Sequence, residues 1–127
     1  MKPGRELDAI VAEKVMGWEK FLIDQSAPYY SDEDKKRGYF WMIGTVSVGC
    51  TNNDGSPKCP RYSTNIAAAW EVVEKLRGVW DIRSMSTTWV VRLSIQVGTS
   101  DKRVGAEAET VQHAICLAAL KAMEINI

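Results

Sequence analysis

The chain has 127 residues, of which 46% are hydrophobic and 25% are charged, a composition typical of one globular domain. Sixteen basic residues balance sixteen acidic ones, which excludes the positive overall field that favours binding to a DNA or RNA duplex. No window reaches the roughly 18 apolar residues of a membrane span, the charged start at Met1–Glu6 is unlike a signal peptide, and three cysteines are too few for a disulfide framework. We therefore expect a single domain over residues 1–127 that works in the cytoplasm.

The first helix is predicted between Gly4 and Gly17, with acidic residues in its first turn, where the helix dipole favours them. Its apolar residues recur at helical spacing at Leu7, Ile10, Val11 and Val15. Residues 24–38 follow as a predicted loop, because Pro28 and Gly38 punctuate a charged stretch.

The middle of the chain predicts a strand, a loop and a helix. Aromatic and β-branched residues indicate a strand over Tyr39–Val48. Gly49–Pro60 has almost no apolar residue and is predicted to be a surface loop, which could contribute to a pocket. A helix capped by Ser63 or Thr64 is expected to end at Gly78. Its predicted buried stripe consists of Ile66, Trp70, Val73 and Leu76.

The last third predicts three strands and a helix. Val79–Met85 and Trp89–Val97 form a predicted hairpin, and the second strand alternates apolar and polar residues. Gly98–Lys102 is predicted to be a turn, followed by a short edge strand over Val104–Ala108 and a helix capped by Thr110. The buried stripe of that helix is predicted to be Val111, Ile115, Ala119, Leu120 and Met123.

The order of these elements is helix, strand, helix, three strands, helix. Consecutive strands joined by short turns are antiparallel, and amphipathic helices cover the faces of a sheet. The sequence therefore predicts an α+β fold, a three-layer α-β-α sandwich in which about three helices cover a mostly antiparallel four-stranded sheet.

Residue types suited to catalysis or metal binding are sparse. His113 could act as a general base or a ligand, but its place in a first helical turn favours an ordinary polar surface role. Cys50 and Cys59 could meet across their loop, although two free thiols are the simpler interpretation, and Cys116 is predicted to be a core residue. Zinc ligands usually come in pairs two to four residues apart. We therefore expect no metal site, no cofactor and no enzyme active site.

Tryptophans and arginines supply the candidate binding residues. An aromatic plane can stack on a base, and guanidinium groups can hold phosphates. We select Arg61, Arg92 and Arg103 for anion contacts, Trp89 for stacking, and Thr110 at a helix N-terminus whose amides could face a phosphate. The alternative remains equally open that Trp89 is a core residue and that Arg92 and Arg103 are ordinary surface residues.

Three segments carry a resemblance to a known family. Gly4–Trp18, Tyr62–Val73 and Ala114–Ala122 look like the opening, second and closing helical signatures of the phage ABA-sandwich domain family. The resemblance implies a phage-encoded protein with an α-β-α layered fold. That family in turn resembles the Thoeris anti-defence sponge proteins, which are oligomeric and bind a cyclic ADP-ribose isomer without cleaving it.

The leading hypothesis is therefore a phage-encoded anti-defence protein of the host cytoplasm. It would act as a homo-oligomer that sequesters a small nucleotide immune signal, either a cyclic ADP-ribose isomer or a cyclic oligonucleotide, without cleaving it. A second hypothesis is a protein-binding module that inhibits a host protein, because exposed tryptophans and arginines are common hot-spot residues. A third is a nucleotide hydrolase or a cyclase-like enzyme.

Overall fold

The computed structural model describes residues 1–43, 46–47 and 60–123, which contain four helices and six strands. In chain order these are α1 (Arg5–Lys14), β1 (Trp18–Leu22), α2 (Asp32–Arg37), β2 (Tyr39–Ile43), β3 (Val46–Ser47), α3 (Ile66–Lys75), β4 (Val79–Ser84), β5 (Trp89–Val97), β6 (Ser100–Ala108) and α4 (Val111–Ala122). The α+β class expected from the sequence is confirmed. The predicted surface loop at Gly49–Pro60, together with Cys50 and Cys59, lies outside the described residues except for Pro60.

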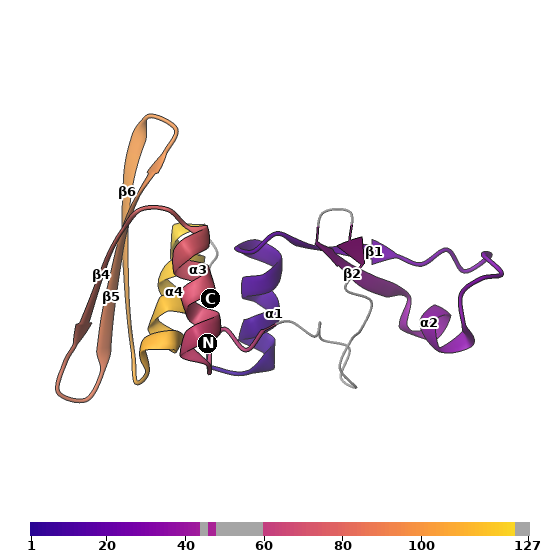
Figure 1. The fold of residues 1–127 in the computed structure, drawn as a ribbon, viewed down its shortest axis with the longest axis horizontal. Coiled ribbons are helices and arrows are strands. Elements are labelled where there is room, and N and C mark those ends of the chain that lie inside the picture. Colours follow the sequence, from indigo (N-terminus) through magenta and orange to yellow (C-terminus); the bar gives the residue numbers. More distant parts are fainter. Residues whose placement is uncertain (44–45, 48–59, 124–127) are drawn as a thin grey trace.

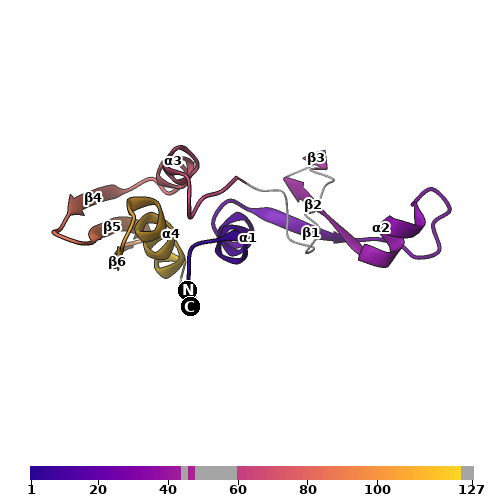
Figure 2. The same ribbon diagram turned by 90° about the horizontal axis from the view of Figure 1, so that it is seen from below.

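The strands form two separate antiparallel sheets, β1–β2–β3 and β4–β5–β6. Figure 1 shows the second sheet with α3 and α4 on one face and α1 beyond them. We call these elements the body. The first sheet and α2 project from the far side of α1, and we call residues 18–47 the arm (Figures 1 and 2).

The prediction of one four-stranded sheet is corrected by this topology. Tyr39–Ile43 pairs with Trp18–Leu22 and has no place beside the strands of the body. At the end of α1, Gly17 adopts a φ of 81°, and the residues after it extend as β1, which pairs with Tyr39–Ile43. Because α3, α4 and α1 all lie on one side of the body's sheet, the described residues supply no helix layer on its other face (Figure 2).

The segment predicted to be a loop over residues 24–38 contains the short helix α2. The Ser31 hydroxyl accepts a hydrogen bond from the Asp34 amide at 3.1 Å and so caps the first turn. Gly38 ends the helix in the left-handed region, at a φ of 85°. Local capping therefore gives this charged stretch a helical turn despite its lack of apolar residues.

The second long helix, α3, differs from its prediction in its cap, its end and its buried face. The cap is Asn65, whose side chain accepts from the Ala68 amide at 3.1 Å, and the helix ends before Leu76. Ala69 and Val72 are fully buried, whereas Ile66 and Trp70 are each 49% exposed. The interpretation of Trp70 as a core residue is therefore wrong. The small side chains at 68 and 69 let α3 lie close to α4, which turns the bulky residues outward.

The C-terminal predictions are largely confirmed. β4 and β5 form the expected hairpin, and β6 pairs along its whole length with β5 as an edge strand. β6 begins at Ser100, so the turn is shorter than predicted, with Gly98 at a φ of 65°. Thr110 caps α4, and this helix packs its buried face, which includes Ile115, Cys116 and Leu120, against the core of the body. The prediction that Met123 is buried is wrong, because this residue follows the end of the helix and is 41% exposed.

Candidate functional site

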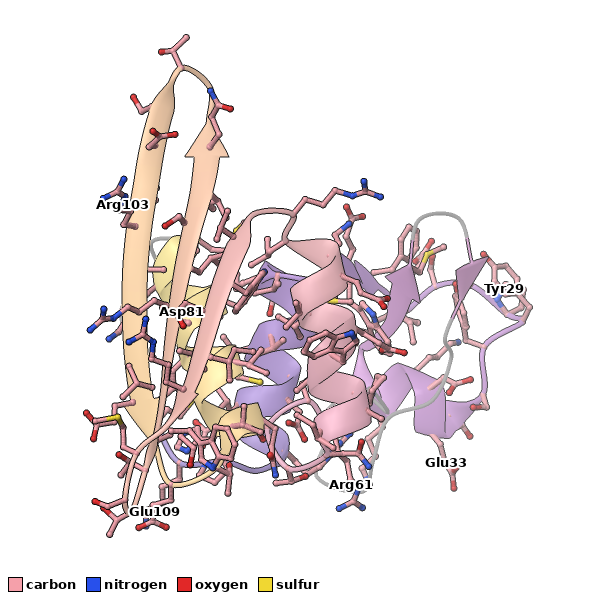
Figure 3. The ribbon with its side chains drawn as sticks, turned by 60° about the vertical axis from the view of Figure 1, so that its left-hand side comes forward. Tyr29, Glu33, Arg61, Asp81, Arg103 and Glu109 are labelled. Atoms are coloured by element: carbon pink, nitrogen blue, oxygen red, sulfur yellow. The ribbon has the colours of Figure 1, made fainter. Side chains whose placement is uncertain are left out.

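One face of the body's sheet packs on the helices and the other lies bare in the described structure. Side chains alternate along β5, so that Val91 and Leu93 are buried while Arg92 between them is exposed. Figure 3 shows Asp81 and Arg103 on the side of the sheet away from the helices. We call this side the outer face. Its residues from the three strands, set by the register, are Val79, Asp81, Arg83, Val90, Arg92, Ser94, Arg103, Gly105 and Glu107.

Three arginines of the outer face lie on one diagonal across the three strands. Arg83 of β4 is opposite Val90, two residues before Arg92 on β5. Arg103 of β6 is opposite Ser94, two residues after Arg92. Diagonal neighbours of this kind lie about 7–8 Å apart, which is within the reach of long side chains. All three are exposed, and we call them the arginine diagonal.

The three arginines differ in how they are engaged. Arg83 Nε donates to Asp81 Oδ1 at 3.1 Å, an exposed ion pair. Arg92 and Arg103 make no hydrogen bond or ion pair within the described part of the chain. The carboxylate of Glu107 accepts from the Thr88 hydroxyl at 2.7 Å. Two guanidinium groups therefore remain available for an external anion.

Gly105 lies beside Arg92 and carries no side chain. The two residues are direct partners in the register of β5 and β6. A Cβ added at Gly105 would lie 3.6 Å from Cγ of Arg92, an ordinary van der Waals distance. Because position 105 has no side chain, nothing there separates the Arg92 stem from a molecule lying on the sheet.

The structure brings together two of the five predicted site residues, Arg92 and Arg103. Trp89 is three residues before Arg92 on β5, so its side chain is on the inner face, where it is half-buried against the core. It therefore cannot stack on a ligand held on the outer face. Arg61 lies before α3, at the opposite side of the body from Arg103 (Figure 3). Thr110 accepts a hydrogen bond from the His113 amide at 3.3 Å as the cap of α4.

Arg83 is the member of the arginine diagonal that sequence reasoning left out of the site. Its position follows from the register of the β4–β5 hairpin, in which Ser84 pairs with Trp89 and Arg83 with Val90. An exact register across the Ser84–Trp89 turn would have placed Arg83 opposite Val90, on the same face as Arg92 and diagonal to it.

A hollow of about 480 Å³ lies at the start of α4. It is lined by Met1, Lys2, Pro3, Glu107, Ala108, Glu109, Thr110 and His113. His113 Nε2 donates to the Met1 carbonyl at 2.7 Å, so the imidazole holds the N-terminal residues in place. The carboxylates of Glu107 and Glu109 offset the positive charge of Lys2 in this lining. The hollow is therefore less suited to an anionic ligand than the arginine diagonal is.

The free thiol of Cys116 is buried in the body. Burial raises the pKa of the Cys116 thiol, and the nearby Asp8 carboxylate adds to the effect, so this sulfur stays protonated. Among the residues that the structure describes, no three His, Cys, Asp or Glu side chains gather as metal ligands. The described helices include none that is both long and apolar enough to cross a membrane.

Comparison with known proteins supports the resemblance seen in the sequence. Residues 9–120 match the model of the phage ABA sandwich domain. The chain belongs to the phage ABA sandwich domain family. This family member is also similar to a solved phage protein from Bacillus cereus ATCC 14579, with 28% sequence identity and a TM-score of 0.57 over 100% of this chain and 92% of that one. No curated protein matches it.

The family and the solved relative together make this a phage protein. The match covers the second half of α1, all of α3, the body's sheet and most of α4, as well as the arm. In this member of the family, the arginine diagonal is the feature of the body with the clearest capacity to bind an anion.

Proposed function

We propose that this phage ABA sandwich protein binds and sequesters a small nucleotide immune signal without cleaving it. A cyclic ADP-ribose isomer or a cyclic oligonucleotide is the class of ligand that we propose. The observation that carries the proposal is the arginine diagonal, whose two unpaired members share one exposed face of a rigid sheet. Such a protein would counter host defence from within the host cytoplasm.

Guanidinium groups suit this role because their planar donors match two phosphate oxygens at once. Arg92 lies in the middle strand, which is hydrogen-bonded on both sides, so its backbone needs no ordering when a ligand binds. Each good charge-assisted hydrogen bond contributes about 1.5–3 kcal/mol. Two such arginines could therefore supply a large share of the affinity for a nucleotide in the micromolar range or tighter.

Retention without cleavage fits the chemistry of the outer face. Its arginines supply positive charge and hydrogen-bond donors, which hold phosphates. The neighbouring carboxylates of Asp81 and Glu107 are engaged by Arg83 and Thr88. The proposal therefore assigns no proton transfer and no nucleophile to this face.

We further propose that the protein acts as a homo-oligomer. A nucleotide on a flat sheet face keeps much of its surface in water, whereas tight small-molecule sites bury most of the ligand. A second copy opposite the outer face would enclose the base, which Trp89 cannot reach from the inner face. Light scattering with and without ligand would test this arrangement.

The experiment that tests the proposal is ligand retention. The purified protein is incubated with cyclic ADP-ribose isomers and cyclic oligonucleotides, separated from free ligand and heat-denatured, and the released compound is identified by chromatography. We expect one nucleotide to be released intact in proportion to protein. Retention of no nucleotide, or release of a modified one, would overturn the proposal.

Matched variants assign the binding to the arginine diagonal. Arg92→Ala and Arg103→Ala each remove one guanidinium group from the outer face and should reduce retention at least tenfold. Arg61→Ala removes the same charge from an exposed position before α3, and we expect retention to be unchanged. Equal losses in all three variants would indicate a general charge effect instead of a site.

A further inference from the structure

The sheet of the body has two edge strands, β4 and β6, whose free edges differ. On β6, Lys121 of α4 reaches the strand, and its ammonium group donates to the Gly105 carbonyl at 2.7 Å. A lysine at such a place hinders the approach of a further strand. On β4, which lies at the end of the sheet in Figure 2, no other described element donates a hydrogen bond to the backbone of the free edge. The edge of β4 is therefore the one open to strand addition.

The alternation of hydrogen bonds along β4 identifies the residues whose backbone faces this edge. The Met85 amide donates to the Thr88 carbonyl at 2.7 Å, which makes these two residues a hydrogen-bonded pair at the hairpin turn. In an antiparallel ladder such pairs alternate with pairs that are not hydrogen-bonded. Every second residue of β4, counted back from Met85, therefore bonds to β5. The amides and carbonyls of Trp80, Ile82 and Ser84 point away from β5 and offer a ladder for one further strand.

Two charged side chains of β4 decide which strand fits this ladder. Asp81 and Arg83 alternate with the edge-facing residues and lie on the outer face. If two β4 strands pair about a twofold axis at Ile82, Asp81 of each copy is opposite Arg83 of the other. A twofold axis at Asp81 or at Arg83 would instead place two like charges directly opposite, which is unfavourable. Among these registers, only the alignment on Ile82 makes the edge complementary to itself.

The same register suits the individual side chains. Asp81 and Arg83 would face each other in pairs that are not hydrogen-bonded, where cross-strand side chains are closest. Within one chain, Arg83 Nε donates to Asp81 Oδ1 at 3.1 Å, which leaves Oδ2 to accept from Arg83 of the second copy. On the inner face, Ile82 is half-buried at the border of the core and would meet Ile82 of the second copy. Such apolar β-branched pairs stabilise a sheet.

We propose that β4 pairs antiparallel with β4 of a second copy, with Ile82 opposite Ile82, and joins the two sheets into one continuous sheet. Contacts of this isologous kind are the usual basis of twofold dimers. The outer faces of the two copies, each with its arginine diagonal, then lie side by side on one surface. This interface adds to the enclosure of the outer face, deepens the proposed homo-oligomer on which it rests, and needs no nucleotide to form.

Charge reversal at the edge tests the proposal by sedimentation of the full chain without nucleotide. Asp81→Arg and Arg83→Asp each place like charges opposite across the interface, and each variant alone should weaken the dimer by about tenfold or more. Mixed in equal amounts, the two variants should dimerise again, because every charge then meets its opposite on the other copy. Repulsion within each chain persists in the mixture, so this rescue reports the contact between copies.

Asp101→Arg is the matched control, since it makes the same charge change on β6, the other edge strand. It should leave the dimer intact. The proposal is overturned if the wild type is monomeric, if neither single variant weakens the dimer, or if the mixture fails to restore it. A monomer that still retains nucleotide would refute the edge contact alone, whereas a dimer that retains none would refute nucleotide sequestration alone.

Discussion

Ser63 and Asp8 meet inside the body although 55 residues separate them in the chain. The Ser63 hydroxyl donates to Asp8 Oδ1 at 2.6 Å, and the Ser63 amide donates to the same oxygen at 2.8 Å. Arg5 Nη1 lies 3.0 Å from the other carboxylate oxygen. The chain leaves the body after α1 to build the arm and returns just before α3 (Figure 1). This contact therefore closes the body at the base of the arm.

Removing the Ser63 hydroxyl should destabilise the body. In Ser63→Ala, the fully buried Asp8 carboxylate loses a short charge-assisted hydrogen bond and gains no replacement from water. We expect the free energy of unfolding to fall by about 1–3 kcal/mol, measured by urea denaturation.

Thr64→Ala is the control for this prediction, since Thr64 is adjacent and exposed. A change within about 0.5 kcal/mol is expected for a surface position of this kind. If Ser63→Ala were no less stable than Thr64→Ala, the contact with Asp8 would not stabilise the body.

Two glycines of the body should respond oppositely to alanine. A Cβ at Gly78 would lie 2.5 Å from the Ser94 carbonyl oxygen and 2.6 Å from Ile95 Cγ2, and the carbonyl is fixed in the sheet. Gly78→Ala should therefore cost about 1–3 kcal/mol through overpacking. Gly105→Ala meets only ordinary contacts and should be neutral or stabilising by up to about 1 kcal/mol. Thermal unfolding of the two variants makes the comparison, and equal losses would contradict it.

The Cys116 thiol should be unreactive in the folded protein. Burial raises its pKa, and alkylation requires the thiolate. In a Cys50→Ser/Cys59→Ser background, iodoacetamide at pH 8.5 should modify Cys116 only after unfolding, as measured by mass spectrometry. Rapid modification under native conditions would mean that α4 opens readily.

The same shift has a consequence for stability at alkaline pH. The unfolded thiol ionises near pH 8.5, whereas the folded one stays protonated, so above that pH the unfolded state binds fewer protons and the free energy of unfolding falls as the pH rises. The contribution of Cys116 to this fall should be at most about 1.4 kcal/mol per pH unit. Cys116→Ala should show a shallower decline between pH 8.5 and 10.5 than the parent protein, and an identical decline would contradict the assignment.

The sequence predicts well those elements whose signals are local. Thr110 caps α4, and the alternation in β5 separates Val91 from Arg92, as the residue pattern indicates. The partner of Tyr39–Ile43 is decided by the tertiary structure, since the residues of this strand do not themselves select between the two sheets. The exposure of Trp70 could not be predicted from the sequence, because the spacing of apolar residues fits two overlapping faces of α3. Close packing against α4 selects which of the two faces is buried.

The candidate site was also predictable only in part, because local sequence signals give the chemistry of a residue and tertiary geometry decides its neighbours. Arg92 and Arg103 were selected for their chemistry, and the register of β5 with β6 places them on one face. Trp89 was paired with them through nearness in sequence, but three residues along a strand lead to the opposite face. Arg61 belongs to a different part of the body, which only the tertiary structure reveals.

Arg92→Lys should distinguish recognition by shape from attraction by charge. Lysine keeps the positive charge of the outer face but replaces the planar fork of donors with a single ammonium group. If Arg92 holds a phosphate through two donors, Arg92→Lys should retain less nucleotide than the wild type and more than Arg92→Ala, with a loss of about three- to tenfold. Retention is measured at low and at physiological salt, since a purely electrostatic contact weakens as salt screens it. Full retention by Arg92→Lys at both salt concentrations would mean that position 92 supplies charge alone, and the geometric role would then fall to Arg103.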